Sequence, residues 1–240
     1  MIEKVMGRYS VLGAEARPSV YTVYLTLKVH SVNTNLMKEP YHHGDLRNGL
    51  IAEGLRLVET AGAEGFSLRE AARGLGVTAN AAYRHYADKS DLLTAIAAQG
   101  FGVLSEQLQA ALAAAKDEAA PAQMRVLGAA YVALATARPE LFRLMFGPYG
   151  LCQIMRLPLA ETGPSAGQIL NGILDDMVRE GFMSAAAREG ALLRVWSAIH
   201  GFALLALDGL EGLETPPKRD KALHGMMGFI LKGLCDQSPG

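Results

Sequence analysis

Alanine and leucine recur at intervals of three and four residues along the chain from about residue 45 onward. This spacing places apolar side chains along one face of a helix, whereas a half-buried strand needs alternation at every second residue. Only the stretch 20–29 alternates in that way, and a lone strand has no partner for its backbone groups. The sequence therefore predicts an all-α protein of about nine helices.

Residues that cap helices divide this region into elements. Asp45 is expected to cap the first helix, and Ser67 to Glu70 has the pattern of a capping box, in which the serine oxygen accepts from a backbone N–H and the glutamate reaches back. Thr78 and Asp88 are expected to cap the next two helices. Further helices are predicted at about 122–137, 139–146, 165–181, 185–208 and 218–236.

Charge, cysteine content and hydropathy exclude several classes of protein. With 23 Lys and Arg against 24 Asp and Glu, the net charge is −1, so any contact with nucleic acid must come from a local patch. Two cysteines, Cys152 and Cys235, are too few for a disulfide framework or a zinc finger. No apolar run has the length of a membrane span, and the N-terminus lacks the apolar core of a secretory signal. We expect a soluble, cytoplasmic protein with no cofactor.

The segment from Ser67 to Tyr86, SLREAARGLGVTANAAYRHY, contains two short capped helices on either side of Gly76. Glycine takes a positive φ without steric penalty, as a tight turn between two steeply angled helices requires. The residues that can form a small shared interior with the first helix are Leu68, Ala71, Ala72, Leu75, Val77 and Ala82. This spacing is typical of a helix-turn-helix, whose second helix enters the major groove of DNA.

The chain resembles the TetR family of bacterial transcriptional regulators in YHHGDLRNGLI at 41–51, in the helix-turn-helix and in AYRHYADKSDLL at 82–93. The family places an aromatic residue near the end of the second helix, another aromatic three residues later, then a polar cap and a lysine. The matching residues are Tyr83, Tyr86, Asp88 and Lys89. In addition, Trp196, His200 and Gly201 resemble the Trp-His-Gly signature of one TetR subgroup.

The resemblance implies a division of the chain into a DNA-binding domain at 38–92 and an effector-binding and dimerisation domain at 93–240. The extension at 1–37 is expected to be poorly ordered, because its one strand-like stretch is unpaired. The implied function is repression, in which a small apolar effector moves a long fourth helix and changes the spacing of paired recognition helices. The implied partners are double-stranded operator DNA, the effector and a second copy of the chain.

Eight residues are candidate DNA contacts: Ser67, Thr78, Ala79, Asn80, Tyr83, Arg84, His85 and Lys89. Asn80 is suited to pair with adenine, and Ala79 to touch a thymine methyl group. Tyr83 and His85 are suited to phosphates, which position a protein without reading sequence, and Lys89 adds its charge to the positive end of a helix. The alternative for each is an exposed residue with no DNA contact.

The predicted DNA-binding domain at 38–92 is not basic, because it has seven Lys and Arg against eight Asp and Glu. DNA binding therefore requires that Lys38, Arg47, Arg84 and Lys89 gather on one face. Tyr86 is expected to pack inside the domain rather than to contact DNA.

Methionine and aromatic residues of the second domain are candidates for an apolar effector pocket, because such side chains repack around varied ligands. They are Met124, Leu127, Tyr131, Phe142, Met145, Phe146, Met177 and Trp196, with His200 as the candidate polar contact. The same residues can equally form ordinary core. The predicted dimer interface uses the last two helices through Leu192, Leu193, Trp196, Ile199, Ala203, Leu223, Met226, Met227, Ile230 and Leu234.

Two other interpretations stay open from the sequence. One is a TetR-like activator, or a sensor of a protein partner. The other is a small all-α enzyme using Cys152 or His200, although no catalytic arrangement is recognisable and the motif at 67–89 would be left unexplained. A metal site is not expected, because His42 and His43 have no third ligand at helical spacing.

Overall fold

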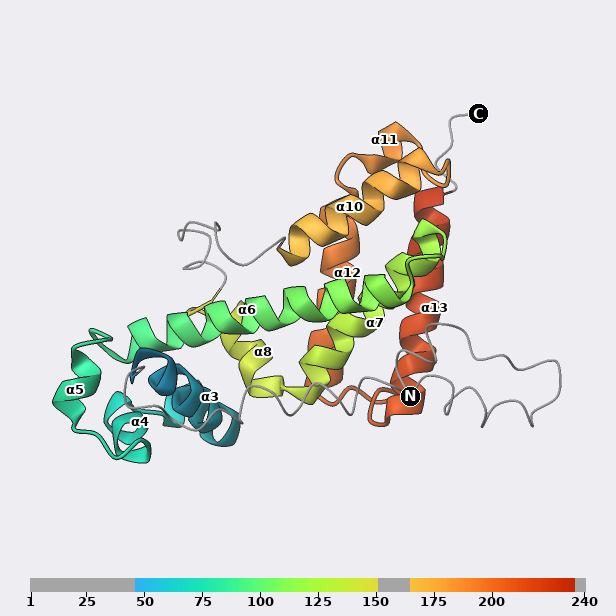
Figure 1. The fold of residues 1–240 in the computed structure, drawn as a ribbon. Helices are drawn as coiled ribbons and strands as arrows, with labels where there is room; N and C mark the ends of the chain where they lie inside the picture. The colour runs from blue at the N-terminus through green and yellow to red at the C-terminus, as the bar shows by residue number, and fades with distance from the viewer. Residues whose placement is uncertain (1–45, 151–164, 236–240) are drawn as a thin grey trace, which may run out of the picture.

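The computed structural model describes residues 46–150 and 165–235, and these ranges form ten α-helices, labelled as in Figure 1. The prediction of an all-α fold is confirmed. Within the described ranges, no helix is both long enough and apolar enough to cross a membrane. The predicted extension at 1–37 and the predicted cap Asp45 lie outside the described residues.

Three helices pack around one small core at one end of the molecule (Figure 1). They are α3 (Leu46–Gly65), α4 (Leu68–Gly74) and α5 (Ala79–Tyr83). The buried residues of this core include Leu50, Val58, Phe66, Leu68, Ala71, Ala72 and Ala82. Gly76, between α4 and α5, has a φ of 69°, the left-handed conformation that the predicted tight turn requires.

The start of α4 forms one half of the predicted capping box. Ser67 Oγ accepts from the backbone N–H of Glu70 at 3.2 Å, but the Glu70 carboxylate accepts from Arg73 instead of reaching back to Ser67. The serine alone therefore provides the cap. The predicted cap Asp88 is complete, because its carboxylate accepts from the N–H of Asp91 at 2.9 Å.

The second helix of the helix-turn-helix, α5, is shorter than predicted. Thr78 caps it as expected, since Thr78 Oγ1 accepts from a backbone N–H three residues later at 3.3 Å. The helix ends at Tyr83 rather than near Tyr86. The N–H groups of His85 and Tyr86 both donate to the carbonyl of Ala82, at 3.0 and 3.1 Å, and so close the chain into a turn.

The helix α6 (Lys89–Ala114), with 26 residues, connects the three N-terminal helices to the remainder of the described chain (Figure 1). It contacts α3 on one side and, along its length, α7, α8 and α10. The other helices are α7 (Ala120–Ala137), α8 (Pro139–Phe146), α10 (Ala166–Arg179), α11 (Ala185–Arg188), α12 (Ala191–Leu207) and α13 (Pro216–Cys235). Because α7 contacts α6, α8, α10, α12 and α13, it is the central helix of this part.

One predicted helix, 185–208, is divided into α11 and α12. The division falls at Glu189, which has an extended backbone, and at Gly190, which has a φ of 67°. A left-handed residue cannot continue a right-handed helix, and only glycine adopts this conformation readily. This break explains why the described ranges contain ten helices rather than about nine.

Several residues predicted for the dimer interface are instead buried inside the chain: Ile199, Ala203, Leu223, Met227 and Leu234. The reason is that α7 lies against both α12 and α13, and Gly128 of α7 leaves room for Met227, whose sulfur lies 3.2 Å from the place of a Cβ at that glycine. The large apolar residues of α12 and α13 that remain exposed are Leu193, Leu204, Leu205 and Phe229.

Two glycines allow α6 to approach its neighbours closely. A Cβ at Gly54 of α3 would lie 2.7 Å from Ile96 of α6, and a Cβ at Gly100 of α6 would lie 2.8 Å from Met145 and 2.9 Å from Leu141 of α8. Carbon atoms in ordinary contact are about 3.5–4.0 Å apart. The absence of a side chain at these two positions therefore sets the distance between helices.

We predict that Gly100→Ala lowers the free energy of unfolding by about 1–2 kcal/mol, because overpacking of a buried contact outweighs the gain in helix propensity. Gly102→Ala on the same helix is the matched control, since a Cβ there meets nothing within 4 Å. This control should gain up to about 1 kcal/mol. Urea unfolding of both variants measures the difference, and equal effects at the two positions would contradict the close approach.

Candidate functional site

The second helix of the helix-turn-helix presents a largely exposed surface at the end of the molecule (Figure 1). All candidate DNA contacts except Ser67 lie on α5, on the turns beside it or at the first residue of α6. Ser67 caps the preceding helix, α4. The exposed candidates are Ser67, Thr78, Asn80, Tyr83, Arg84 and His85, while Ala79 and Lys89 are partly exposed.

The ammonium group of Lys89 is held by a neighbouring helix. Its Nζ donates to the backbone carbonyl of Glu64 at 2.9 Å, at the C-terminal end of α3. Gly62, with a φ of 71° and a ψ of 169°, interrupts α3 two residues before this carbonyl, and the bond is favourable because its donor is charged. An ammonium group has three donors, and this is the one hydrogen bond of Lys89 Nζ among the described residues.

Tyr86 packs in the core, as predicted. Its side chain is 1% exposed, its hydroxyl donates to the backbone carbonyl of Arg47 at 3.3 Å, and the Arg47 guanidinium lies 5.4 Å from the ring centre. These contacts connect the start of α3 to the end of the helix-turn-helix. The residue therefore packs beneath the predicted DNA-contact residues rather than among them.

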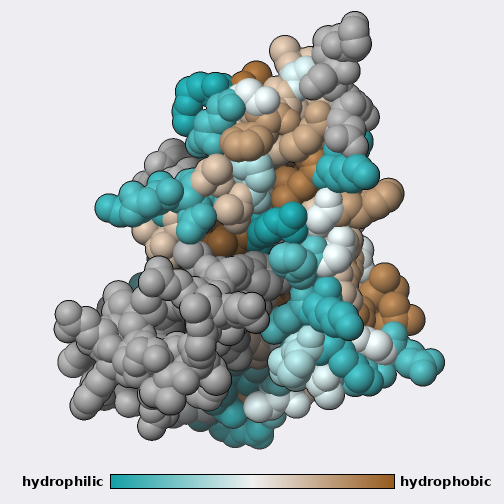
Figure 2. Space-filling view, turned by 90° about the vertical axis from the view of Figure 1, so that its right-hand side faces the viewer, coloured by the Kyte–Doolittle hydropathy of each residue, from teal (hydrophilic) through white to brown (hydrophobic). Residues whose placement is uncertain are grey.

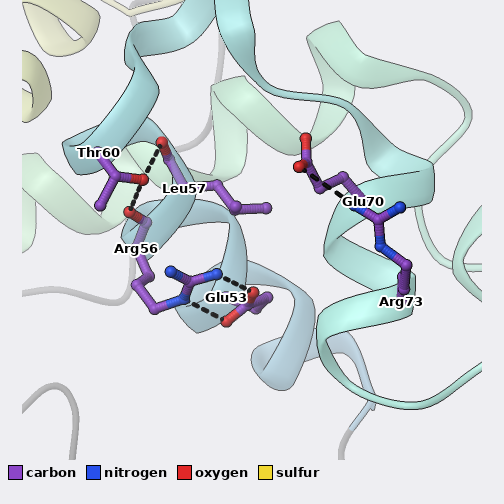
Figure 3. A network of polar contacts seen from close by, with 6 residues as sticks. All are labelled: Glu53, Arg56, Leu57, Thr60, Glu70 and Arg73. Carbon is purple, nitrogen blue, oxygen red and sulfur yellow. Dashed lines mark hydrogen bonds and ion pairs between the residues drawn. The ribbon is translucent and has the colours of Figure 1, made fainter.

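Ion pairs neutralise two cations of this region (Figure 3). Arg56 donates to both carboxylate oxygens of Glu53, at 2.9 and 2.6 Å, and this hydrogen bonding raises the pKa of Arg56. Arg73 pairs with Glu70 at 3.3 Å. Among the described residues, Arg84 takes part in no ion pair, so the turn after α5 keeps an unneutralised positive charge. Lys38 lies outside the described residues.

Five of the predicted pocket residues come together in one group, which we call the aromatic cluster. It consists of Tyr131 on α7, Phe142 and Phe146 on α8, and Trp196 and His200 on α12. The ring centres of Phe146 and His200 are 4.6 Å apart, and Trp196 stacks on His200 at 5.4 Å. Tyr131 meets Phe142 edge-on at 5.5 Å. Three helices thus contribute to one continuous set of ring contacts.

The aromatic cluster contains a polar pair. The Tyr131 hydroxyl oxygen lies 2.8 Å from His200 Nδ1. Burial raises the pKa of Tyr131 well above its usual value and lowers the pKa of His200. Both shifts favour the uncharged forms, so a phenol and a neutral imidazole share this hydrogen bond at neutral pH.

The other four predicted pocket residues, Met124, Leu127, Met145 and Met177, are buried. None of them is aromatic, and they take no part in the ring contacts. Sequence reasoning missed Phe101 of α6, whose ring meets Phe146 edge-on at 5.3 Å. Phe101 follows the buried residue Ala97 by four positions, so both lie on the same face of α6. This spacing was the sequence feature from which the contact could have been predicted.

Two protein families match the chain. The family described as tetR-family bacterial regulatory proteins matches residues 50–96, and the tetracyclin repressor-like C-terminal domain matches residues 124–230. Together the two matches span more than half of the chain. The chain belongs to the TetR family.

Solved structures share the fold of this TetR-family chain. A protein of unknown function from Rhodococcus sp. RHA1 is 29% identical, with a TM-score of 0.67 over 82% of this chain and 100% of that chain. A TetR-family transcriptional regulator from Pectobacterium atrosepticum is 22% identical, with a TM-score of 0.60 over 82% of this chain and 96% of that chain. At 22% identity, the similarity to the Pectobacterium protein shows only that the two chains share a fold. No curated protein matches significantly.

Both candidate sites lie within the matched parts of this TetR-family chain. The helix-turn-helix falls within 50–96, and the aromatic cluster falls within 124–230. The chain is thus a DNA-binding transcription regulator and not an enzyme. Assignment to the Trp-His-Gly subgroup stays a prediction.

An ion pair connects the two parts of the TetR-family fold. Arg138, between α7 and α8, donates to Glu59 of α3 at 2.6 Å, and both side chains are partly buried, with 12% and 28% exposed. Sequence reasoning missed this pair, because its members are 79 residues apart and nothing in the local pattern of either marks the other. At the far end of α8, Arg143 contacts the end of α12 through Asp208 at 3.6 Å.

We predict that a double-mutant cycle with Glu59→Gln and Arg138→Gln gives a coupling energy of about 1–3 kcal/mol, because partial burial strengthens the attraction. The matched control is the exposed pair Glu70 and Arg73, for which the same cycle should give less than about 1 kcal/mol. Urea unfolding measures both cycles. A Glu59–Arg138 coupling no larger than that of the control would contradict a structural role for the pair.

Proposed function

We propose that this TetR-family regulator is a repressor that a small apolar effector, bound at the aromatic cluster, releases from its operator. The observation that carries this proposal is the position of α8. This helix supplies Phe142 and Phe146 to the aromatic cluster, and it also contacts α3 and α6, which belong to the DNA-binding end. A ligand that displaces α8 therefore acts directly on the helices that support α5.

The release mechanism is a shift between two populations. An effector changes DNA affinity only if it binds the two conformations with different affinity. Movement of α8 would be transmitted to α3 by the Glu59–Arg138 pair and to α6 by the close contact at Gly100. In a dimer, rotation of α6 would change the separation of the two recognition helices, which must match half-sites about 34–36 Å apart or a multiple of that distance.

The DNA surface is proposed to consist of the eight predicted residues around α5. Asn80 and Ala79 would read base edges in the major groove. Tyr83, Arg84 and His85 would contact phosphates, together with the ammonium group of Lys89. The exposure of Asn80, Tyr83 and Arg84 supports these roles, since a side chain must be accessible to reach DNA.

The dimer is proposed to form through the exposed side of α12 and α13. These helices contact each other and leave Leu193, Leu204 and Phe229 in solvent, with Phe229 82% exposed. Figure 2 views the molecule from the side on which α13 lies, and hydrophobic surface is visible there between hydrophilic patches. A twofold dimer formed in this way presents two recognition helices, as a palindromic operator requires.

We place the boundary between the DNA-binding domain, 38–92, and the effector and dimerisation domain, 93–240, within α6. Binding to an operator also implies a cytoplasmic location. Transcription in vitro from the promoter of the chain's own gene tests the direction of regulation. Added protein should lower the transcript level, whereas an increase would favour the activator.

For DNA binding, we predict that Asn80→Ala relaxes the preference at one base position by about 1–3 kcal/mol. Arg84→Ala should weaken binding to all sequences alike and reduce the slope of log affinity against log salt by about one unit. Arg179→Ala on α10, far along the chain from the helix-turn-helix, is the charge-matched control. Fluorescence anisotropy with an operator library measures both effects. An unchanged base profile for Asn80→Ala would remove that residue from the base-reading surface.

For the dimer, we predict that Phe229→Asp gives monomers in sedimentation velocity, because the interface would have to bury an unpaired charge. Phe182→Asp is the control, since Phe182 is also exposed, at 39%, but lies outside α12 and α13. Met227 is unsuitable for this test, because it is fully buried and a charge there would unfold the chain. A Phe229→Asp protein that remains dimeric would place the interface elsewhere.

A further inference from the structure

The hydrogen bond between Tyr131 and His200 has a defined direction. Tyr131 is 6% exposed, and among the described residues His200 Nδ1 is the acceptor within reach of its hydroxyl, at 2.8 Å. A buried O–H group without an acceptor is strongly unfavourable. The phenol therefore donates to Nδ1, and a neutral imidazole that accepts at Nδ1 carries its proton on Nε2.

The Nε2–H group of His200 lies in apolar surroundings. The imidazole stacks on Trp196 with an interplanar angle of 27°, and its centre is 4.6 Å from that of Phe146 and 5.6 Å from that of Phe142. Within the described part of the chain, Tyr131 is the hydrogen-bond partner of His200. The partly buried imidazole thus lies among apolar rings, and its Nε2–H has no hydrogen-bond partner in the described part of the chain.

The aromatic cluster has no charged member. In the described ranges, no Lys, Arg, Asp or Glu contributes to its ring contacts or to the hydrogen bond at Tyr131. An ionic ligand would lose hydration without gaining an opposite charge, which is strongly unfavourable. A planar ligand can stack on the rings, and an acceptor oxygen on that ligand matches the free donor.

We propose that the aromatic cluster binds an uncharged, planar molecule with a carbonyl oxygen, such as an aromatic ketone, which accepts from His200 Nε2–H. Tyr131 is a positioning residue, because its hydroxyl keeps the imidazole proton on Nε2. This inference rests on the proposed effector site and names the chemical class of its ligand.

The test uses four compounds with one ring skeleton: indane, 1-indanone, 1-aminoindane as a cation and indane-1-carboxylate as an anion. Trp196 is the single tryptophan of the chain, so one indole N–H signal in a ¹H–¹⁵N NMR spectrum of the full-length protein reports binding at this place. We expect 1-indanone to bind about tenfold more tightly than indane, as one added neutral hydrogen bond provides. Both ions should bind more weakly than indane.

Variants separate the donor from the general apolar surface. His200→Phe should retain indane binding and lose the preference for the ketone, whereas Ser197→Ala, on the exposed side of α12, should keep the preference. In the unchanged protein, imidazole ¹⁵N shifts should show the Nε2–H form. Tyr131→Phe should give a mixture of the two neutral forms and a several-fold weaker affinity for 1-indanone alone.

Two results would overturn the inference in distinguishable ways. Equal affinity for indane and 1-indanone, or tightest binding of either ion, would reject the ligand class while leaving an effector site at the aromatic cluster. No change of the Trp196 signal with any of the four compounds would reject both the ligand class and this location for the effector.

Discussion

The packing of α6 is the constraint on which the rest of the structure depends. Leu92, Leu93 and Ile96, near its start, are fully buried and close the core formed with α3, while Leu104 and Ala111 are buried in the core around α7. One rigid helix therefore belongs to two cores. Because packed interiors deform little, a displacement at one end of α6 must be accommodated at the other. The helices approach closely at Gly54 and Gly100, so there is little free space at these contacts in which a displacement of α6 could be absorbed.

The aromatic cluster combines apolar rings with one hydrogen-bonded polar pair, Tyr131 and His200. Burial keeps Tyr131 and His200 uncharged, and their mutual hydrogen bond avoids the penalty of an unpaired polar group. A core that served only for packing would need neither the Tyr131 hydroxyl nor the His200 imidazole. Their place on α7 and α12, beside the rings that α8 supplies, puts the polar pair next to the helix that also contacts the DNA-binding end.

At the helix-turn-helix end, ion pairs neutralise some cations and leave others without an ion pair among the described residues. The pairs Glu53–Arg56 and Glu70–Arg73 neutralise charges on α3 and α4, whereas Arg84, after α5, has no such partner in the described part of the chain. The net charge of a domain therefore does not predict the electrostatic potential around one of its helices. The arrangement of the ion pairs decides where positive potential remains.

The sequence by itself determined the helical class, the helix-turn-helix and the family, because these depend on local features: spacing of apolar residues, caps such as Thr78 and Asp88, and a glycine at position 76. It predicted the members of the aromatic cluster only as a wider list, since composition does not tell which apolar residues meet. Tertiary structure decided the Tyr131–His200 bond, the Glu59–Arg138 pair and the burial of Met227. Each of these joins residues far apart in the chain, and their meeting depends on how helices pack rather than on where helices begin and end.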